Sequence, residues 1–202
     1  MTLTAFALNC TLKPSPQSSS TELLMSQMLA DLESNGVTTT SARLVDYNIT
    51  PGVETDMGDG DEWPGIRAQI LAADIFVVVT PTWVGQLTSV GQQILERLDA
   101  ELSETDDKGR PSLYDKVAVV GVVGNEDGAH HITAQLFQGL ADLGFTVSSQ
   151  ASTYWNGEAM HSVDYKDLPE TPDAVASATK ALASNAAHLA GLLKQSPYPA
   201  TS

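Results

Sequence analysis

Two uninterrupted runs of mostly β-branched apolar residues restrict how this chain can fold. They are Ile75 to Val79 and Val117 to Val123, and neither alternates with polar residues. A strand with one solvated face shows that alternation, whereas a parallel strand covered by helices on both faces does not. Both runs therefore predict central strands of a parallel sheet.

Segments with helical spacing lie between the apolar runs. The first begins at Ser19, which forms a capping-box pattern with Glu22, and it ends before Gly36. Asp61 and Pro64 mark the start of the next helix. Other strands are expected at 3–8, 40–45 and 145–149, and other helices at 90–102, 132–143 and 173–194. Strand–helix units joined by right-handed crossovers predict an α/β three-layer sandwich, which we expect to be a single domain over residues 1–202.

The composition excludes several classes of protein. The net charge of −15, from 25 acidic and 10 basic residues, argues against nucleic acid or an anionic membrane surface as a partner. No apolar run approaches the roughly 20 residues that span a bilayer, and a signal-peptide layout is missing, so a cytoplasmic protein is expected. The single cysteine, Cys10, excludes an intrachain disulfide and a cysteine-rich zinc site. We expect Cys10 to be a small half-buried residue rather than a reactive thiol.

In an open parallel sheet, ligands bind beyond the carboxyl ends of the strands, so three loops are candidates for a site. They follow the first, third and fourth predicted strands, at 9–21, 81–89 and 124–131. The first ends in four consecutive hydroxyl residues at a helix N-terminus, where free N–H groups and the helix dipole favour a phosphate. The residues expected to bind phosphate are Thr11, Lys13, Ser18, Ser20 and Thr21.

The first loop also allows other interpretations. Ser18 or Ser19 could simply cap the helix, a role that needs only one hydroxyl. The loop contains no glycine, so it is neither a Walker A loop nor a G-x-G-x-x-G dinucleotide fingerprint. A nucleoside triphosphatase is therefore not expected.

The other two loops offer a flat apolar wall and polar groups. Trp83 could stack on a planar ligand and Gly85 lets backbone approach one closely, unless Trp83 folds back into the core. The loop 124–131 places polar residues between two glycines. A metal site at His130 and His131 is not favoured, because adjacent residues on a helix point in different directions. An acid/base pair of Glu126 and Asp127 is equally weakly supported, and Asp127 could instead cap the next helix.

These residues resemble the flavodoxin-like fold and, within it, the superfamily of NADPH-dependent FMN reductases and quinone reductases. The resemblance covers nearly the whole chain in element order and rests on the hydroxyl loop, on TPTWVG at 80–85 and on GNEDG at 124–128. The usual Gly-Ser-x-Arg phosphate loop is replaced by a longer loop with Asn9, Thr11 and Lys13.

The resemblance implies a five-stranded parallel sheet of order 2-1-3-4-5 that binds FMN without a covalent bond. It places the phosphate on the first loop and the ring between the other two, with NAD(P)H as co-substrate and a homo-oligomer, dimer or tetramer, as the assembly. The residues expected around the ring are Pro81, Thr82, Trp83, Val84, Gly85, Gly124, Asn125, Glu126, Asp127 and Gly128.

The leading hypothesis is an FMN-binding oxidoreductase that passes reducing equivalents from NAD(P)H to a quinone, free flavin or similar small-molecule acceptor. The flavin carries that chemistry, so no catalytic side chain and no metal are assigned. The alternatives are a flavodoxin-like electron carrier with a protein partner, which the acidity favours, and a flavin-free binding domain. The segment 154–160 favours the reductase, where it could wall the flavin, receive substrate or simply pack.

Overall fold

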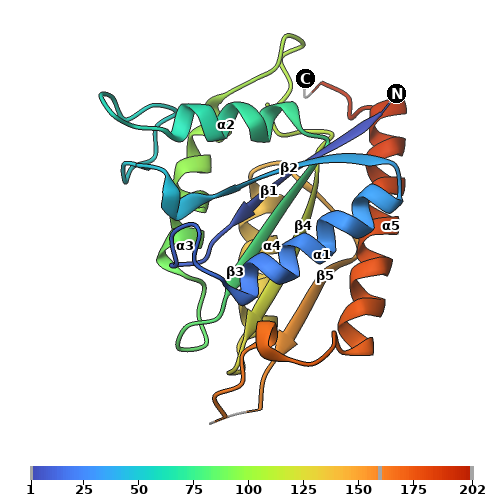
Figure 1. Cartoon of the computed structure of the whole chain (residues 1–202). Helices are drawn as coiled ribbons and strands as arrows, with labels where there is room; N and C mark the ends of the chain where they lie inside the picture. Colours follow the sequence, from blue (N-terminus) through green and yellow to red (C-terminus); the bar gives the residue numbers. More distant parts are fainter. Residues whose placement is uncertain (1, 159–160, 201–202) are drawn as a thin grey trace.

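The structure is a computed structural model that describes residues 2–158 and 161–200 (Figure 1). Its strands are β1 (Leu3–Asn9), β2 (Val37–Arg43), β3 (Ile75–Pro81), β4 (Val117–Gly124) and β5 (Thr146–Asn156). Its α-helices are α1 (Ser20–Ser34), α2 (Trp63–Ala72), α3 (Ser89–Leu98), α4 (Ala129–Asp142) and α5 (Asp173–Gln195). Short 3₁₀ helices form at η1 (Leu44–Asp46), η2 (Asp99–Ser103) and η3 (Tyr165–Asp167).

The strands form one parallel sheet in the order β2-β1-β3-β4-β5, which confirms the predicted topology. The direction of winding reverses between β1 and β3. The loops that follow these two strands therefore diverge and leave a crevice at the carboxyl edge of the sheet.

Helices cover both faces of the sheet, as the unbroken apolar runs predicted. Along β4, Ala118, Val120 and Val122 pack towards α2, α3 and α4, whereas Val117 and Val119 pack towards α1 and α5. Figure 1 shows α1 and α5 side by side on one side of the sheet. In the part of the chain that the structure describes, no helix is long and apolar enough to cross a membrane.

Two predicted strand boundaries are wrong. The second strand was expected at 40–45 but spans Val37–Arg43, because its pairing follows β1 from Leu3↔Val37 to Asn9↔Arg43. The fifth was expected at 145–149 but runs on to Asn156. Polar residues at 148–150 interrupt its apolar pattern, and this interruption concealed the second half of the strand.

The interruption in β5 is a bulge. Ala118 pairs with Val147 and Val120 with Ser152, so two steps along β4 match five along β5, and β5 carries three extra residues. Pairing then continues to Gly124↔Asn156. The bulge thus brings Trp155 opposite Val123, at the carboxyl edge of the sheet.

Candidate functional site

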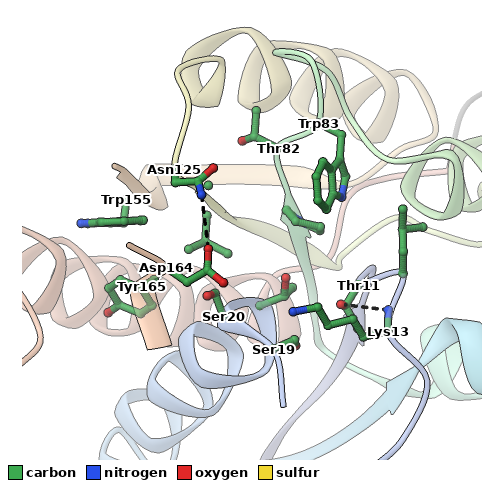
Figure 2. A pocket seen from close by; sticks show the side chains of 15 residues that line it. Thr11, Lys13, Ser19, Ser20, Thr82, Trp83, Asn125, Trp155, Asp164 and Tyr165 are labelled. Atoms are coloured by element: carbon green, nitrogen blue, oxygen red, sulfur yellow. Dashed lines mark hydrogen bonds between the residues drawn. The ribbon is translucent and has the colours of Figure 1, made fainter. Parts of the chain in front are cut away.

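A cleft opens at the carboxyl edge of the sheet, where the crevice between the β1 and β3 loops was expected (Figure 2). Residues from five segments line it: Thr11, Leu12 and Lys13; Ser19, Ser20 and Thr21; Pro81, Thr82 and Trp83; Val123, Gly124 and Asn125; and Trp155, Asp164 and Tyr165. Figure 2 shows Trp83 and Trp155 on opposite sides of this cleft.

The first loop is held from behind by Arg43. Its guanidinium donates to the carbonyl oxygens of Lys13 at 3.1 Å and Gln17 at 2.8 Å, and it pairs with Glu22 at 3.1 Å. The Arg43 guanidinium therefore stabilises the conformation of the loop. Lys13 is the one cation among the residues that line the cleft, and Figure 2 shows its side chain reaching past Thr11 towards the start of α1.

The hydroxyl run divides into residues with different roles. Ser19 caps α1, since its hydroxyl accepts from the Glu22 amide at 3.0 Å, so the capping interpretation is right for this residue. Ser20 lines the cleft and accepts from the Lys166 amide at 3.3 Å, and Thr21 is buried beside it. Ser18 is exposed and lies outside the cleft lining. The first-turn amides of α1 have no intrahelical partner, and amides in this position favour the binding of an anion.

The segment after β3 is a tight two-residue turn that carries Trp83. The Trp83 amide donates to the Gln86 carbonyl at 3.1 Å and the Gln86 amide to the Trp83 carbonyl at 3.0 Å. Val84 and Gly85 both take positive φ, 54° and 68°, as a type I′ turn requires. Trp83 is 54% exposed, so the interpretation of this residue as core is wrong.

The loop after β4 supports that turn. Glu126 accepts from the Val84 amide at 2.8 Å, and a Cβ at Gly128 would stand 2.8 Å from the Cα of Gly85. Val84, Gly85, Glu126 and Gly128 therefore join the two loops to each other, and they lie outside the cleft lining. Asp127 is exposed and also outside the lining, and it does not cap α4, whose N-cap is Gly128 without a side-chain bond.

Six residues of the lining were not among the expected ligands, and three of these, Trp155, Asp164 and Tyr165, come from β5 and the chain after it rather than from the three candidate loops. Trp155 lies in the segment 154–160, which was expected to wall the flavin, receive substrate or simply pack, although Ala159 and Met160 fall outside the described residues. Its ring centroid lies 5.5 Å from that of Tyr165, and Asp164 accepts from Asn125 at 3.3 Å across the cleft. Asp164 and Tyr165 do not belong to a recognisable motif. They lie in the chain that follows β5, and only the folded structure brings them to the cleft.

One residue of the cleft lining has a buried hydroxyl that lacks a hydrogen-bond partner. Thr82 is 4% exposed, and its Oγ1 has no hydrogen-bond partner among the described residues. A Cβ at Gly124 would stand 2.8 Å from the Cβ of Thr82, so a glycine is needed for β4 to approach this side chain. A partnerless hydroxyl, free helix amides, one cation and two aromatic walls together suit a ligand that is both phosphorylated and planar.

His130, His131 and Cys10 do not line the cleft. His130 Nε2 lies 3.1 Å from the Tyr154 hydroxyl and His131 Nε2 lies 2.9 Å from Gln86 Oε1, so the two rings have separate partners. Cys10 is fully rather than half buried, and burial raises the pKa of its thiol far above the ordinary value. A buried thiol that stays protonated is a poor nucleophile.

The sheet order, the two helical layers and the cleft at the β1/β3 crevice define a flavodoxin-like protein. A family model described as NADPH-dependent FMN reductase matches residues 4–159, and the chain belongs to this family of FMN-dependent oxidoreductases.

Two comparisons combine coverage of nearly the whole chain with more than 30% identity. The 8-demethyl-8-aminoriboflavin-5'-phosphate synthase of Streptomyces davaonensis is 33% identical over 98% of this chain and 81% of that protein. A crystal structure of RosB with bound 8-demethyl-8-formylriboflavin-5'-phosphate superposes with a TM-score of 0.88, at 32% identity over 97% of this chain and 82% of that one.

Of two further matches, one covers a smaller share of both chains and the other has a much lower sequence identity. A protein of Mycobacterium bovis named divalent metal cation transporter MntH is 35% identical over 82% of this chain, which amounts to 25% of that protein. The apo form of an NADH:FMN oxidoreductase shares the fold with a TM-score of 0.69 at 16% identity, over 97% of this chain and 92% of that one.

Proposed function

We propose that this chain binds FMN in the cleft and passes reducing equivalents from NAD(P)H to a small acceptor such as a quinone or free flavin. The observation that carries the proposal is the convergence of separate loops. Nine residues chosen from the sequence as FMN ligands line one cleft: Thr11, Lys13, Ser20, Thr21, Pro81, Thr82, Trp83, Gly124 and Asn125. They come from three loops that are distant in sequence.

The roles of these residues follow from their chemistry. Ser20, Thr21 and the first-turn amides of α1 would hold the phosphate, with Lys13 as its countercharge. Trp83 and Trp155 would flank the ring, and Asn125 with Asp164 would meet its polar edge. FMN itself supplies hydride and electron transfer when it is bound. The protein's contribution would be to orient the ring and to limit the access of water.

The first test is retention of the cofactor. Purified protein mixed with FMN and passed through gel filtration should keep the visible flavin bands, and titration should change FMN fluorescence. Absence of both effects would contradict the proposal. Stopped-flow mixing of the loaded protein with NADH or NADPH under nitrogen should then bleach the flavin, whereas the flavin of an electron carrier would stay oxidised until a partner reductase is added.

A variant of Trp83 tests the arrangement of the ring. If the indole stacks on the flavin, Trp83→Ala should weaken FMN binding by about 1 kcal/mol or more, which is roughly a fivefold rise in Kd. Because Trp83 is 54% exposed, its removal should leave the thermal stability of the protein without FMN nearly unchanged. Unchanged FMN affinity would show that the ring lies elsewhere.

A second candidate function is chemical alteration of a flavin phosphate that acts as substrate. It is favoured by the match of 98% of this chain to the Streptomyces davaonensis synthase, whose name describes a riboflavin-5'-phosphate changed at position 8. Mass spectrometry of the flavin after incubation with NAD(P)H, oxygen and an amino donor separates the candidates. A reductase returns FMN of unchanged mass, whereas a synthase returns a flavin of altered mass.

A further inference from the structure

The turn that carries Trp83 contains a strained residue. Val84 has φ 54°, in the left-handed region that β-branched residues avoid. Its side chain is 85% exposed, so burial of the valine does not offset that strain. Such a conformation persists only when surrounding contacts stabilise it.

Glu126 provides the contact that reaches Val84 directly. Its carboxylate accepts from the Val84 amide at 2.8 Å, across 42 positions of sequence. A hydrogen bond to an ionised carboxylate is about twice as strong as one between neutral groups.

Two neighbouring contacts join the same pair of loops. The Gly128 backbone packs so closely on Gly85 that a Cβ would stand 2.8 Å from the Gly85 carbonyl oxygen. On the outer side, His131 Nε2 lies 2.9 Å from Gln86 Oε1. The Trp83–Gln86 turn is therefore seated on the β4–α4 loop, and Glu126 is the group that bonds to its strained residue.

We propose that Glu126 is a positioning residue for the FMN cleft: it holds Val84 in the left-handed conformation and so keeps Trp83 at the wall of the cleft. Glu126 acts through the turn and does not line the cleft itself. This inference rests on the proposed function, because it assigns a role towards FMN to a contact that the structure describes between two loops.

The test measures FMN affinity for three variants of the loop. Glu126→Ala should raise the Kd for FMN about tenfold, which corresponds to about 1.4 kcal/mol. Glu126→Gln keeps an acceptor oxygen and should stay within about threefold of the wild type. Asp127→Ala is the matched control, since it removes a neighbouring acidic side chain that is exposed and makes no hydrogen bond in the described residues. It should leave the Kd unchanged.

A second background separates positioning from general destabilisation. Val84→Gly removes the strain that Glu126 offsets, so adding Glu126→Ala to it should raise the Kd less than threefold. The visible circular dichroism of bound flavin should change in Glu126→Ala and return towards the wild-type spectrum in the double variant. Equal Kd values for Glu126→Ala and the wild type, or an undiminished tenfold loss in the Val84→Gly background, would overturn the proposal.

Hydrogen exchange in the protein without FMN tests the role of Glu126 independently of FMN binding. Exchange of the Val84 amide should accelerate in Glu126→Ala but not in Asp127→Ala. If the wild type binds no FMN, the proposed function fails, and the exchange rates still decide whether Glu126 holds the turn. If FMN binds and exchange at Val84 is the same in both variants, the inference fails while the proposed function stands.

Discussion

Thr82→Val should change stability and FMN affinity in opposite directions. Thr82 lines the cleft, is 4% exposed, and its hydroxyl has no hydrogen-bond partner among the described residues. Valine has nearly the same shape but no polar atom. The variant removes the cost of burying an unpaired hydroxyl, and it also removes a group that a bound ligand could satisfy.

The size of each effect follows from the burial of the hydroxyl. An unsatisfied buried polar group costs about 1–3 kcal/mol, so the variant without FMN should be more stable by about 1–2 kcal/mol. In a chain of 202 residues, each kcal/mol raises Tm by about 2–4 °C. A hydrogen bond to the ligand contributes about 0.5–1.5 kcal/mol, so the Kd for FMN should rise about twofold to tenfold.

Thr179→Val provides the matched control for this prediction. The Thr179 hydroxyl is equally buried but satisfied, since it donates to the Val175 carbonyl at 2.8 Å and lies 3.0 Å from Thr153 Oγ1. The Thr179→Val variant should be less stable than the wild type by about 1 kcal/mol and should bind FMN with unchanged affinity. Thermal melting and fluorescence titration measure both quantities. A Thr82→Val variant that is less stable and binds FMN normally would refute the reasoning.

Three further predictions concern charge and the thiol. Lys13→Gln should raise the Kd for FMN about fivefold at low salt in a fluorescence titration, and the difference should shrink in 1 M salt because exposed charges are screened. Burial alone would raise the pKa of Asp61, but hydrogen bonds from the Met57 amide and Arg97 help to lower it from 3.8 to about 2. The ionised Asp61 carboxylate therefore stabilises the fold fully above pH 3.8, and this contribution is lost as pH falls towards 2. The free energies of unfolding in urea of the wild type and Asp61→Asn should differ at pH 6 and converge near pH 2. A difference that persists at pH 2 would contradict this assignment. Cys10 should resist thiol reagents in the folded protein and react fully in guanidinium, and rapid native labelling would show that it is accessible.

The sequence predicted the sheet and two sides of the cleft because their signals are local. The apolar runs at Ile75 and Val117 identify strands buried on both faces, and Ser19 with Glu22 identifies the start of α1. A proline and a glycine around Trp83 indicate that the chain turns away from the core there. Each of these signals depends on neighbouring residues alone.

The remaining features depend on contacts between distant segments. Asp164 reaches Asn125 only after the chain has left the far end of β5, and no pattern near Asp164 indicates that meeting. Glu126 could be identified as a polar residue in the right loop, but its bond to Val84 follows from how two loops pack. The strain at Val84 likewise could not be predicted, because a valine that follows a tryptophan does not indicate a positive φ.

The bulge in β5 sets how far Trp155 extends along the sheet. Its three extra residues, at about 3.3 Å each, shorten the reach of the strand by about 10 Å, so that Trp155 ends level with Val123. If all residues of the bulge were straightened into the regular ladder, the indole would instead extend about 10 Å beyond Val123. A bulge that took up one residue fewer would turn the indole to the opposite face, because side chains alternate along a strand. The bulged conformation of a segment that does not line the cleft therefore determines one wall of it, and we expect substitutions that straighten the bulge at 148–150 to be as damaging to ligand binding as substitution of Trp155 itself.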